Sequence, residues 1–183
     1  MKRSLYLYVT LAIVAIFQNL VHEGAHFLLA RLLSVDVLEF RFLTNGFLTS
    51  QVIYADPVAA RTGAHWLLIG LGPSVITVLI GYTVYLLRKR LLTAFPPANL
   101  AIWYLGALFM TIDPLYVGLA SWFMQGSDVN AMSAVGLPAW PVRIVAMALA
   151  ALGTWLMLRW RSEARENIER YSLASAAPSA PRA

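Results

Sequence analysis

Four long apolar segments constrain this chain more than any other feature of its sequence. A helix needs about 20 mainly apolar residues to cross the roughly 30 Å of hydrocarbon in a bilayer. Segments of that kind cover residues 5–33, 64–87, 98–124 and 142–158. Of the 183 residues, 60% are hydrophobic and 13% charged, and the mean hydropathy is +0.67, as in membrane proteins. We predict an all-α membrane bundle of about four transmembrane helices, integral and multi-pass, in a cell or inner membrane.

The rest of the composition limits the domain organisation and the partners. We predict one membrane-embedded domain over residues 1–171 and a disordered tail over residues 172–183, where small residues and prolines dominate. The formal net charge is +5, but the basic residues stand mostly at the ends of apolar segments, as membrane-flanking charges do, which argues against a nucleic-acid partner. The chain has no cysteine, so a metal ion must be bound by nitrogen and oxygen ligands.

The segment between the first two apolar stretches has the pattern of a β-hairpin. Val37, Glu39 and Arg41 alternate with the apolar residues Leu38, Phe40 and Phe42, and the turn dipeptide Asn45-Gly46 follows. Alternation followed by Asn-Gly is the strongest short-range hairpin signal. We expect a small membrane-associated hairpin over residues 37–54. Its edge would either receive an unwound substrate segment as an added strand, or the hairpin would pack on the helices as a lid.

Three ionisable side chains interrupt the first apolar segment: His22, Glu23 and His26, in the order H-E-x-x-H. Residues i and i+4 share one helix face, so both imidazoles can bind a single zinc ion while Glu23 stands beside it as general base. Each ionisable group at membrane depth costs roughly 2.5–3.5 kcal/mol on insertion scales. Metal coordination offsets such a penalty, so we predict one Zn²⁺ per chain.

A catalytic zinc site requires a third protein ligand and one open coordination position. The candidates are His65, at the start of the second apolar segment, and two acids in or beside apolar stretches, Asp113 and Asp128. From a rise of 1.5 Å per residue along each helix, we expect Asp113 to lie at the same depth in the membrane as the two histidines. The residues alone therefore leave the third ligand open.

Two polar residues are candidates for orienting a ligand or positioning the substrate. Asn19 lies three residues before His22, on the same helix face. Thr111 lies close to Asp113 in the third apolar segment. Helix packing is an equally good explanation for both.

The order of these elements resembles the site-2 protease family of intramembrane zinc metalloproteases, as a small and divergent member. "HEGAHFLLARLLSVDV" is similar to that family's motif helix, and the hairpin and "LLIGLGPSVITVLI", with Gly72-Pro73, follow in the family's order. The resemblance covers roughly residues 10–138. It implies a third ligand from an Asp-Gly motif after an Asn-x-x-Pro stretch. "TIDP" takes the place of the Asn-x-x-Pro stretch, and "GSDVNAM" takes the place of the Asp-Gly motif. Motif order therefore implies Asp128 as the third ligand and leaves Asp113 as the alternative.

The resemblance implies a zinc-dependent endopeptidase that hydrolyses a peptide bond in a membrane-spanning substrate. Its partners would be a membrane protein substrate, the lipid bilayer and membrane proteins that regulate it. A first alternative is a catalytically silent zinc-binding scaffold or chaperone of the same fold. A second is a small ion transporter, in which buried histidine and aspartate relay ions; no inverted repeat supports it.

Overall fold

Helices dominate the computed structural model, which describes residues 2–44, 49–93, 95–123 and 128–176. The long elements are α1 (Lys2–Leu32), β1 (Val37–Thr44), β2 (Thr49–Tyr54), α2 (Ala64–Leu91), α3 (Pro96–Gly118) and α4 (Trp140–Ala176). Three short 3₁₀ segments connect them: η1 (Val58–Ala60), η2 (Ala120–Trp122) and η3 (Asp128–Val135).

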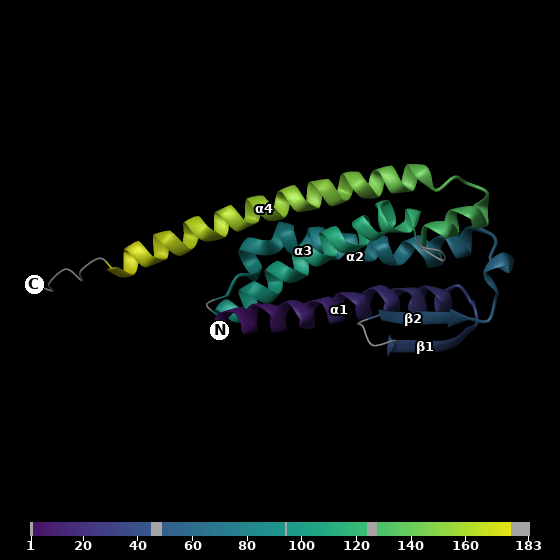
Figure 1. Ribbon diagram of the computed structural model, residues 1–183, viewed down its shortest axis with the longest axis horizontal. Helices are drawn as coiled ribbons and strands as arrows, with labels where there is room; N and C mark the ends of the chain where they lie inside the picture. Colours follow the sequence, from purple (N-terminus) through teal and green to yellow (C-terminus); the bar gives the residue numbers. More distant parts are fainter. Residues whose placement is uncertain (1, 45–48, 94, 124–127, 177–183) are drawn as a thin grey trace, which may run out of the picture.

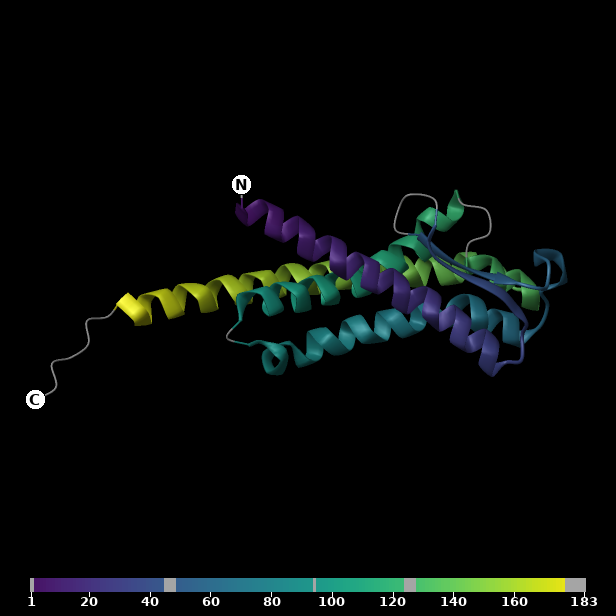
Figure 2. The same cartoon turned by 90° about the horizontal axis from the view of Figure 1, so that it is seen from below.

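The helices form a bundle with the hairpin at one end. α3 packs against both α2 and α4, while α1 packs against α2 and α3. Figure 1 shows the hairpin beside the C-terminal half of α1, and Figure 2 shows α1 crossing the other helices obliquely. The N-terminus and the end of α4 lie at the opposite end of the bundle from the hairpin (Figure 1).

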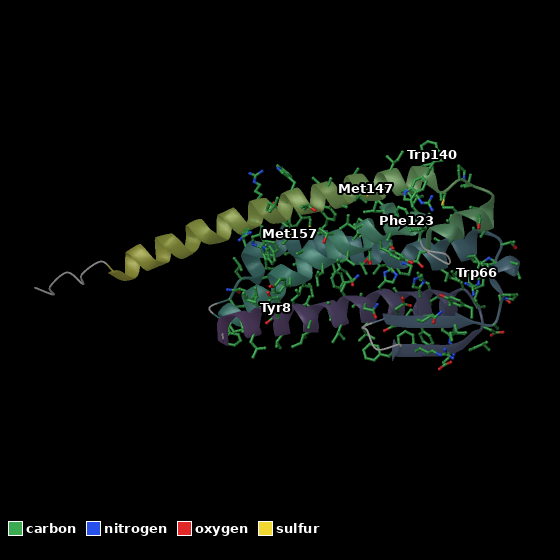
Figure 3. All side chains as sticks on the ribbon, viewed as in Figure 1. Tyr8, Trp66, Phe123, Trp140, Met147 and Met157 are labelled. Atoms are coloured by element: carbon green, nitrogen blue, oxygen red, sulfur yellow. The ribbon has the colours of Figure 1, made fainter. Side chains whose placement is uncertain are left out.

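Each of the four α-helices contains a stretch long and apolar enough to cross a membrane. These stretches are Leu5–Leu32, Ala64–Leu91, Pro97–Trp122 and Trp140–Arg161. Large apolar side chains such as Leu79, Leu86 and Leu158 remain exposed on their outer faces, as a lipid-facing surface requires. Exposed aromatic residues stand near both ends, for example Tyr8 and Trp140 (Figure 3). The predicted four helices and small two-stranded sheet are confirmed.

Close contact between helices is centred on Phe109 and Met110 of α3, which are fully buried. A Cβ atom on Gly81 of α2 would lie 2.7 Å from the backbone nitrogen of Met110, and one on Gly153 of α4 would lie 2.7 Å from its carbonyl oxygen. Glycines therefore let α2 and α4 approach α3 from two sides. Pro114, four residues on, cannot donate to the Met110 carbonyl, but α3 remains helical through it.

The hairpin is fastened to the half of α1 that carries the histidines. β1 and β2 pair antiparallel, with Phe40 opposite Val52. The ring of Phe40 contacts that of Phe27 on α1, with centroids 6.0 Å apart, and Val52 is buried. The predicted Asn45-Gly46 turn lies outside the described residues. The position of the hairpin between α1 and α2 is as predicted.

Helix ends differ from the predicted segments in three places. α2 continues past residue 87 to Leu91, because its last turn is basic and so complements the helix dipole. α3 ends at Gly118 rather than near residue 124, since glycine is a poor helix former and the chain then turns through η2. α4 runs to Ala176 and so includes the start of the predicted tail 172–183, the rest of which lies outside the described residues.

Candidate metal centre

One row of α1 carries three polar side chains into the bundle. Gln18, His22 and His26 are spaced four residues apart, so they lie above one another on a single helix face. All three are buried. The two imidazole rings make an edge-to-face contact with centroids 4.9 Å apart, and their Nε2 atoms are 3.2 Å apart.

Asp128 brings a carboxylate to the same two nitrogen atoms. Its oxygens lie 3.2 Å from Nε2 of His22 and 3.3 Å from Nε2 of His26. Zinc binds imidazole nitrogen and carboxylate oxygen at about 2.0–2.2 Å, so neighbouring ligands of a tetrahedral site are about 3.3–3.6 Å apart. The three separations, 3.2, 3.2 and 3.3 Å, lie at or just below the short end of that spacing. We call these three side chains the ligand cluster.

Asp128 reaches the cluster because η3 folds back against α2. The first residue after it, Val129, is fully buried, and the amide of Gly63 donates to the carbonyl of Ala134 at 2.8 Å. Gly70 of α2 permits the approach: a Cβ atom there would lie 2.3 Å from that of Ala131 and 3.0 Å from the carbonyl oxygen of Asp128. The start of η3 therefore packs into the interior of the protein.

Asp113 of α3 stands on the other side of the His22 ring. Its Oδ2 lies 3.0 Å from Nδ1 of His22, and its Oδ1 accepts a hydrogen bond from Nε2 of Gln18 at 2.9 Å. The hydroxyl of Thr77, on α2, also donates to this carboxylate. An ionised carboxylate only accepts, so Nδ1 of His22 carries the proton and Nε2 presents its lone pair to the cluster. Asp113 is thus placed to orient a ligand histidine.

The cluster has the donor chemistry of a zinc site. With Nδ1 of His22 protonated, its Nε2 and the Asp128 carboxylate are both acceptors, and acceptors only 3.2 Å apart need a proton or a cation to hold them together. Two imidazole nitrogens and one carboxylate oxygen are ligands that zinc accepts, and three protein ligands leave a fourth position open. Nδ1 of His26 has no hydrogen-bond partner among the described residues, so only His22 is backed by a carboxylate.

Glu23 lies beside the ligand cluster and is half-buried. Ligand-type atoms of His22, Glu23 and His26 all fall within 4.8 Å of one another. The carboxylate of Glu23 also makes a hydrogen bond with the backbone of Val52 in β2. The hairpin therefore lies against Glu23 and places its carboxylate next to the ligand cluster.

The other candidates from the sequence do not join the cluster. Oδ1 of Asn19 is buried and has no hydrogen-bond partner in the described part of the chain. Thr111 donates to the carbonyl of Ala107 in its own helix at 2.6 Å, because residues two apart on a helix face opposite ways and Asp113 takes the inward position. His65 is exposed at the start of α2.

Two residues that were not singled out as site residues take part instead. Gln18 replaces Asn19 as the polar partner, and the spacing of four to His22 and again to His26 was the available signal. Thr77 is fully buried and arrives from a different helix, 36 residues from Asp113 in sequence. No spacing rule connects residues on separate helices, so only the fold brings it to the site.

Replacing Gly70 with alanine is expected to weaken metal binding. The added methyl group would overlap Ala131 and crowd the Asp128 carbonyl, so η3 must move away from α2 and take the Asp128 carboxylate with it. Overpacking of this kind costs about 1–3 kcal/mol. Zinc affinity of the purified variant, measured by competition with a chromogenic chelator, checks the expectation.

Gly72→Ala is the matched control for that experiment. A Cβ atom at Gly72 meets only the end of the flexible Leu29 side chain, at 2.6 Å, which can turn aside. Zinc affinity should therefore stay close to that of the unmodified protein. Equal affinity in the Gly70 and Gly72 variants would show that η3 does not depend on the close contact.

Comparisons of this chain with protein-family models, with curated proteins and with solved structures find no match.

Proposed function

We propose that this protein is a zinc-dependent intramembrane endopeptidase, of the type that its motif order resembles. The observation that carries the proposal is the meeting of two histidine nitrogens and the Asp128 carboxylate at 3.2–3.3 Å beside Glu23. His22, His26 and Asp128 are the proposed zinc ligands, and Asp113 is the carboxylate that orients His22. Zinc in such a set acidifies water and polarises a peptide carbonyl.

Glu23 is the proposed general base. Its carboxylate takes a proton from the attacking water as the oxygen–carbon bond forms, and it passes that proton to the amide nitrogen as the carbon–nitrogen bond breaks. The first products are a carboxylic acid and an amine, and the proton of the acid then passes to the amine, leaving a carboxylate and an ammonium group, so atoms and charge balance. The backbone of Val52 in β2 lies within hydrogen-bonding reach of this carboxylate.

The location of the cluster suggests a substrate within or near the bilayer. His22 and His26 belong to the apolar stretch Leu5–Leu32. Glu23 lies nine positions before the end of α1 at Leu32, which corresponds to about 14 Å along a helix. A substrate helix must unwind there before its backbone carbonyl becomes available. The hairpin lies alongside that half of α1 (Figure 2), where it can receive or cover the unwound segment.

A zinc-binding scaffold without turnover is the remaining alternative. It explains the ligand cluster, but it gives no use to a second carboxylate held beside the cluster. An ion transporter needs ionisable groups spread along a path, whereas His22, His26, Asp113 and Asp128 are joined in one set of contacts.

Removal of the metal is expected to abolish peptide-bond cleavage. The full chain, purified in detergent, should hold one zinc ion per chain by elemental analysis. Treatment with o-phenanthroline should stop the cleavage of single-span membrane proteins that carry a tag at each end, and added zinc should restore it, because the protein ligands alone cannot acidify water. A purified protein without zinc, or cleavage that survives chelation, would contradict the proposal.

A further inference from the structure

A small cavity adjoins the ligand cluster on the side of the hairpin and η1. It has a volume of about 110 Å³ and is lined by His26 and Asp128 from the cluster and by Tyr54, Arg61 and Trp66, among others. Trp66 lies at the hairpin end of the bundle (Figure 3). The cavity is too small for a folded segment and is of a size to take one side chain or chain end next to the reacting bond.

Arg61 is held rigidly in the wall of this cavity. Its guanidinium carbon lies 4.8 Å from the ring centroid of Tyr54 and 4.9 Å from that of Trp66, and these two rings contact each other edge to face at 5.1 Å. Its Nε donates to the backbone carbonyl of Asp56 at 3.1 Å. Stacking and this hydrogen bond fix the plane of the guanidinium before any ligand arrives.

The two Nη groups of Arg61 carry the donors that remain. A guanidinium has five N–H groups, and only the one on Nε is used by the Asp56 carbonyl. Among the described residues, no carboxylate oxygen lies within 4.0 Å of Arg61, whereas the exposed Arg41 has such a partner in Glu39 at 2.8 Å. Arg61 is half-buried, so a cation is maintained at the site without an ion-pair partner.

The rest of the cavity wall offers no competing charge of the same sign. Ile69, Gly70, Ala131 and Ala134 are small or apolar lining residues. Burial, followed by the charges of Glu23 and Asp128, raises the pKa of the Tyr54 phenol above its usual value, so its hydroxyl stays protonated and can donate. The Asp128 carboxylate in the lining faces the Nε2 atoms of the two histidines, so the planar fork of Arg61 donors remains for a second carboxylate, the group that matches it best.

We propose that this cavity binds a carboxylate of the substrate through Arg61, next to the peptide bond that is cleaved. The inference rests on the proposed peptidase function and names the class of substrate it would select. The carboxylate has two possible sources: the side chain of an aspartate or glutamate near the cleaved bond, or a free C-terminus left by an earlier cut. Either source would place a carboxylate group on the two Nη atoms of Arg61.

Binding of a small carboxylate tests the cavity without any turnover. The probes are glutarate and its uncharged analogue glutaramide, titrated by calorimetry into the full chain in detergent, with and without zinc. Because hydrogen bonds to charged groups are worth more than neutral ones, we expect glutarate to bind at least about tenfold more tightly. Arg61→Gln should remove that preference, and Arg61→Lys, which keeps the charge but loses the fork, should retain part of it.

Arg143→Gln is the matched control variant. Arg143 also stacks on an aromatic ring, at 4.2 Å from the centroid of Trp122, and donates to Ser121, but it does not line the cavity. Its substitution should leave the preference for glutarate intact. Equal binding of the two probes, or a preference that survives Arg61→Gln in a protein of unchanged melting temperature, would overturn the inference and leave Arg61 as a support for the loop before α2.

Turnover identifies the source of the carboxylate. In a double-tagged substrate with a mapped cleavage site, each nearby acidic residue is changed to its amide, and a peptide ending at that region is compared with a free or an amidated C-terminus. The change that lowers kcat/KM about tenfold in the unmodified enzyme should have no further effect in Arg61→Gln. If neither change matters, the inference fails while zinc-dependent cleavage stands; if cleavage does not need zinc, the peptidase proposal fails while glutarate binding still reports on Arg61.

Discussion

Glu23→Gln is expected to abolish cleavage while the protein keeps its zinc. Glutamine has the same shape, and its amide oxygen can still accept the hydrogen bond from Val52, but it cannot take up a proton at neutral pH. General-base catalysis contributes about 10²–10⁴-fold, so kcat should fall by that factor. Cleavage of double-tagged single-span proteins and elemental analysis of the same sample measure the two quantities together.

Glu39→Gln controls for the loss of a negative charge near the hairpin. Glu39 is an exposed residue of β1 that pairs with Arg41, and it is not part of the ligand cluster. Cleavage by this variant should be unchanged, since an exposed ion pair contributes little. If Glu23→Gln were to cleave as well as the unmodified protein while holding zinc, Glu23 would not be the base, and a metal-binding scaffold or another base would have to be considered.

Asp128→Ala is expected to lose zinc, and Asp113→Asn to keep it with lower affinity. Asp128 faces the Nε2 atoms of both histidines, so its removal leaves two ligands where a zinc site needs three. Of the imidazole nitrogens of His22 and His26, Asp113 contacts Nδ1 of His22 alone, and the loss of such an orienting partner costs about 10- to 100-fold in metal affinity. Zinc retained after dialysis and a competitive titration separate the two outcomes.

The same two variants would also show whether Asp113, and not Asp128, is the third zinc ligand. If Asp113→Asn emptied the site and Asp128→Ala retained zinc, the ligand would be Asp113 and η3 would close the site from outside. Asp36→Asn serves as the control, because this exposed residue at the start of the hairpin uses its backbone carbonyl, at 2.9 Å from the amide of Ala55. Its zinc content should match that of the unmodified protein.

The spans and the histidine motif were predictable because both depend on local spacing. A run of apolar residues reports a membrane-length helix regardless of its neighbours, and His22 and His26 share a face on any helix. The hairpin followed from alternation around Asn45-Gly46 in the same way. These features need no knowledge of how distant parts of the chain meet.

The roles of Asp113 and Asp128 were harder to predict because, in the sequence, both acids are candidates for the same position, the third metal ligand. Asp113 is favoured by depth and Asp128 by motif order, and each argument assigns one ligand position. The imidazole of His22 has two nitrogen atoms, and the structure places one acid at each. Whether η3 enters the bundle depends on the contact between Gly70 and Ala131, which joins residues far apart in the sequence.

The contacts around Asp113 also set how three helices are aligned along their axes. The side chains of Gln18 and His22 (α1), Thr77 (α2) and Asp113 (α3) meet at one level. A slip of one helical turn, about 5.4 Å, would leave a carboxylate without its donors in an apolar interior, where the cost is several kcal/mol. We expect this polar layer to fix the alignment of the helices as the bundle assembles, so that the stable packing also places His22 beside Asp113 and Asp128.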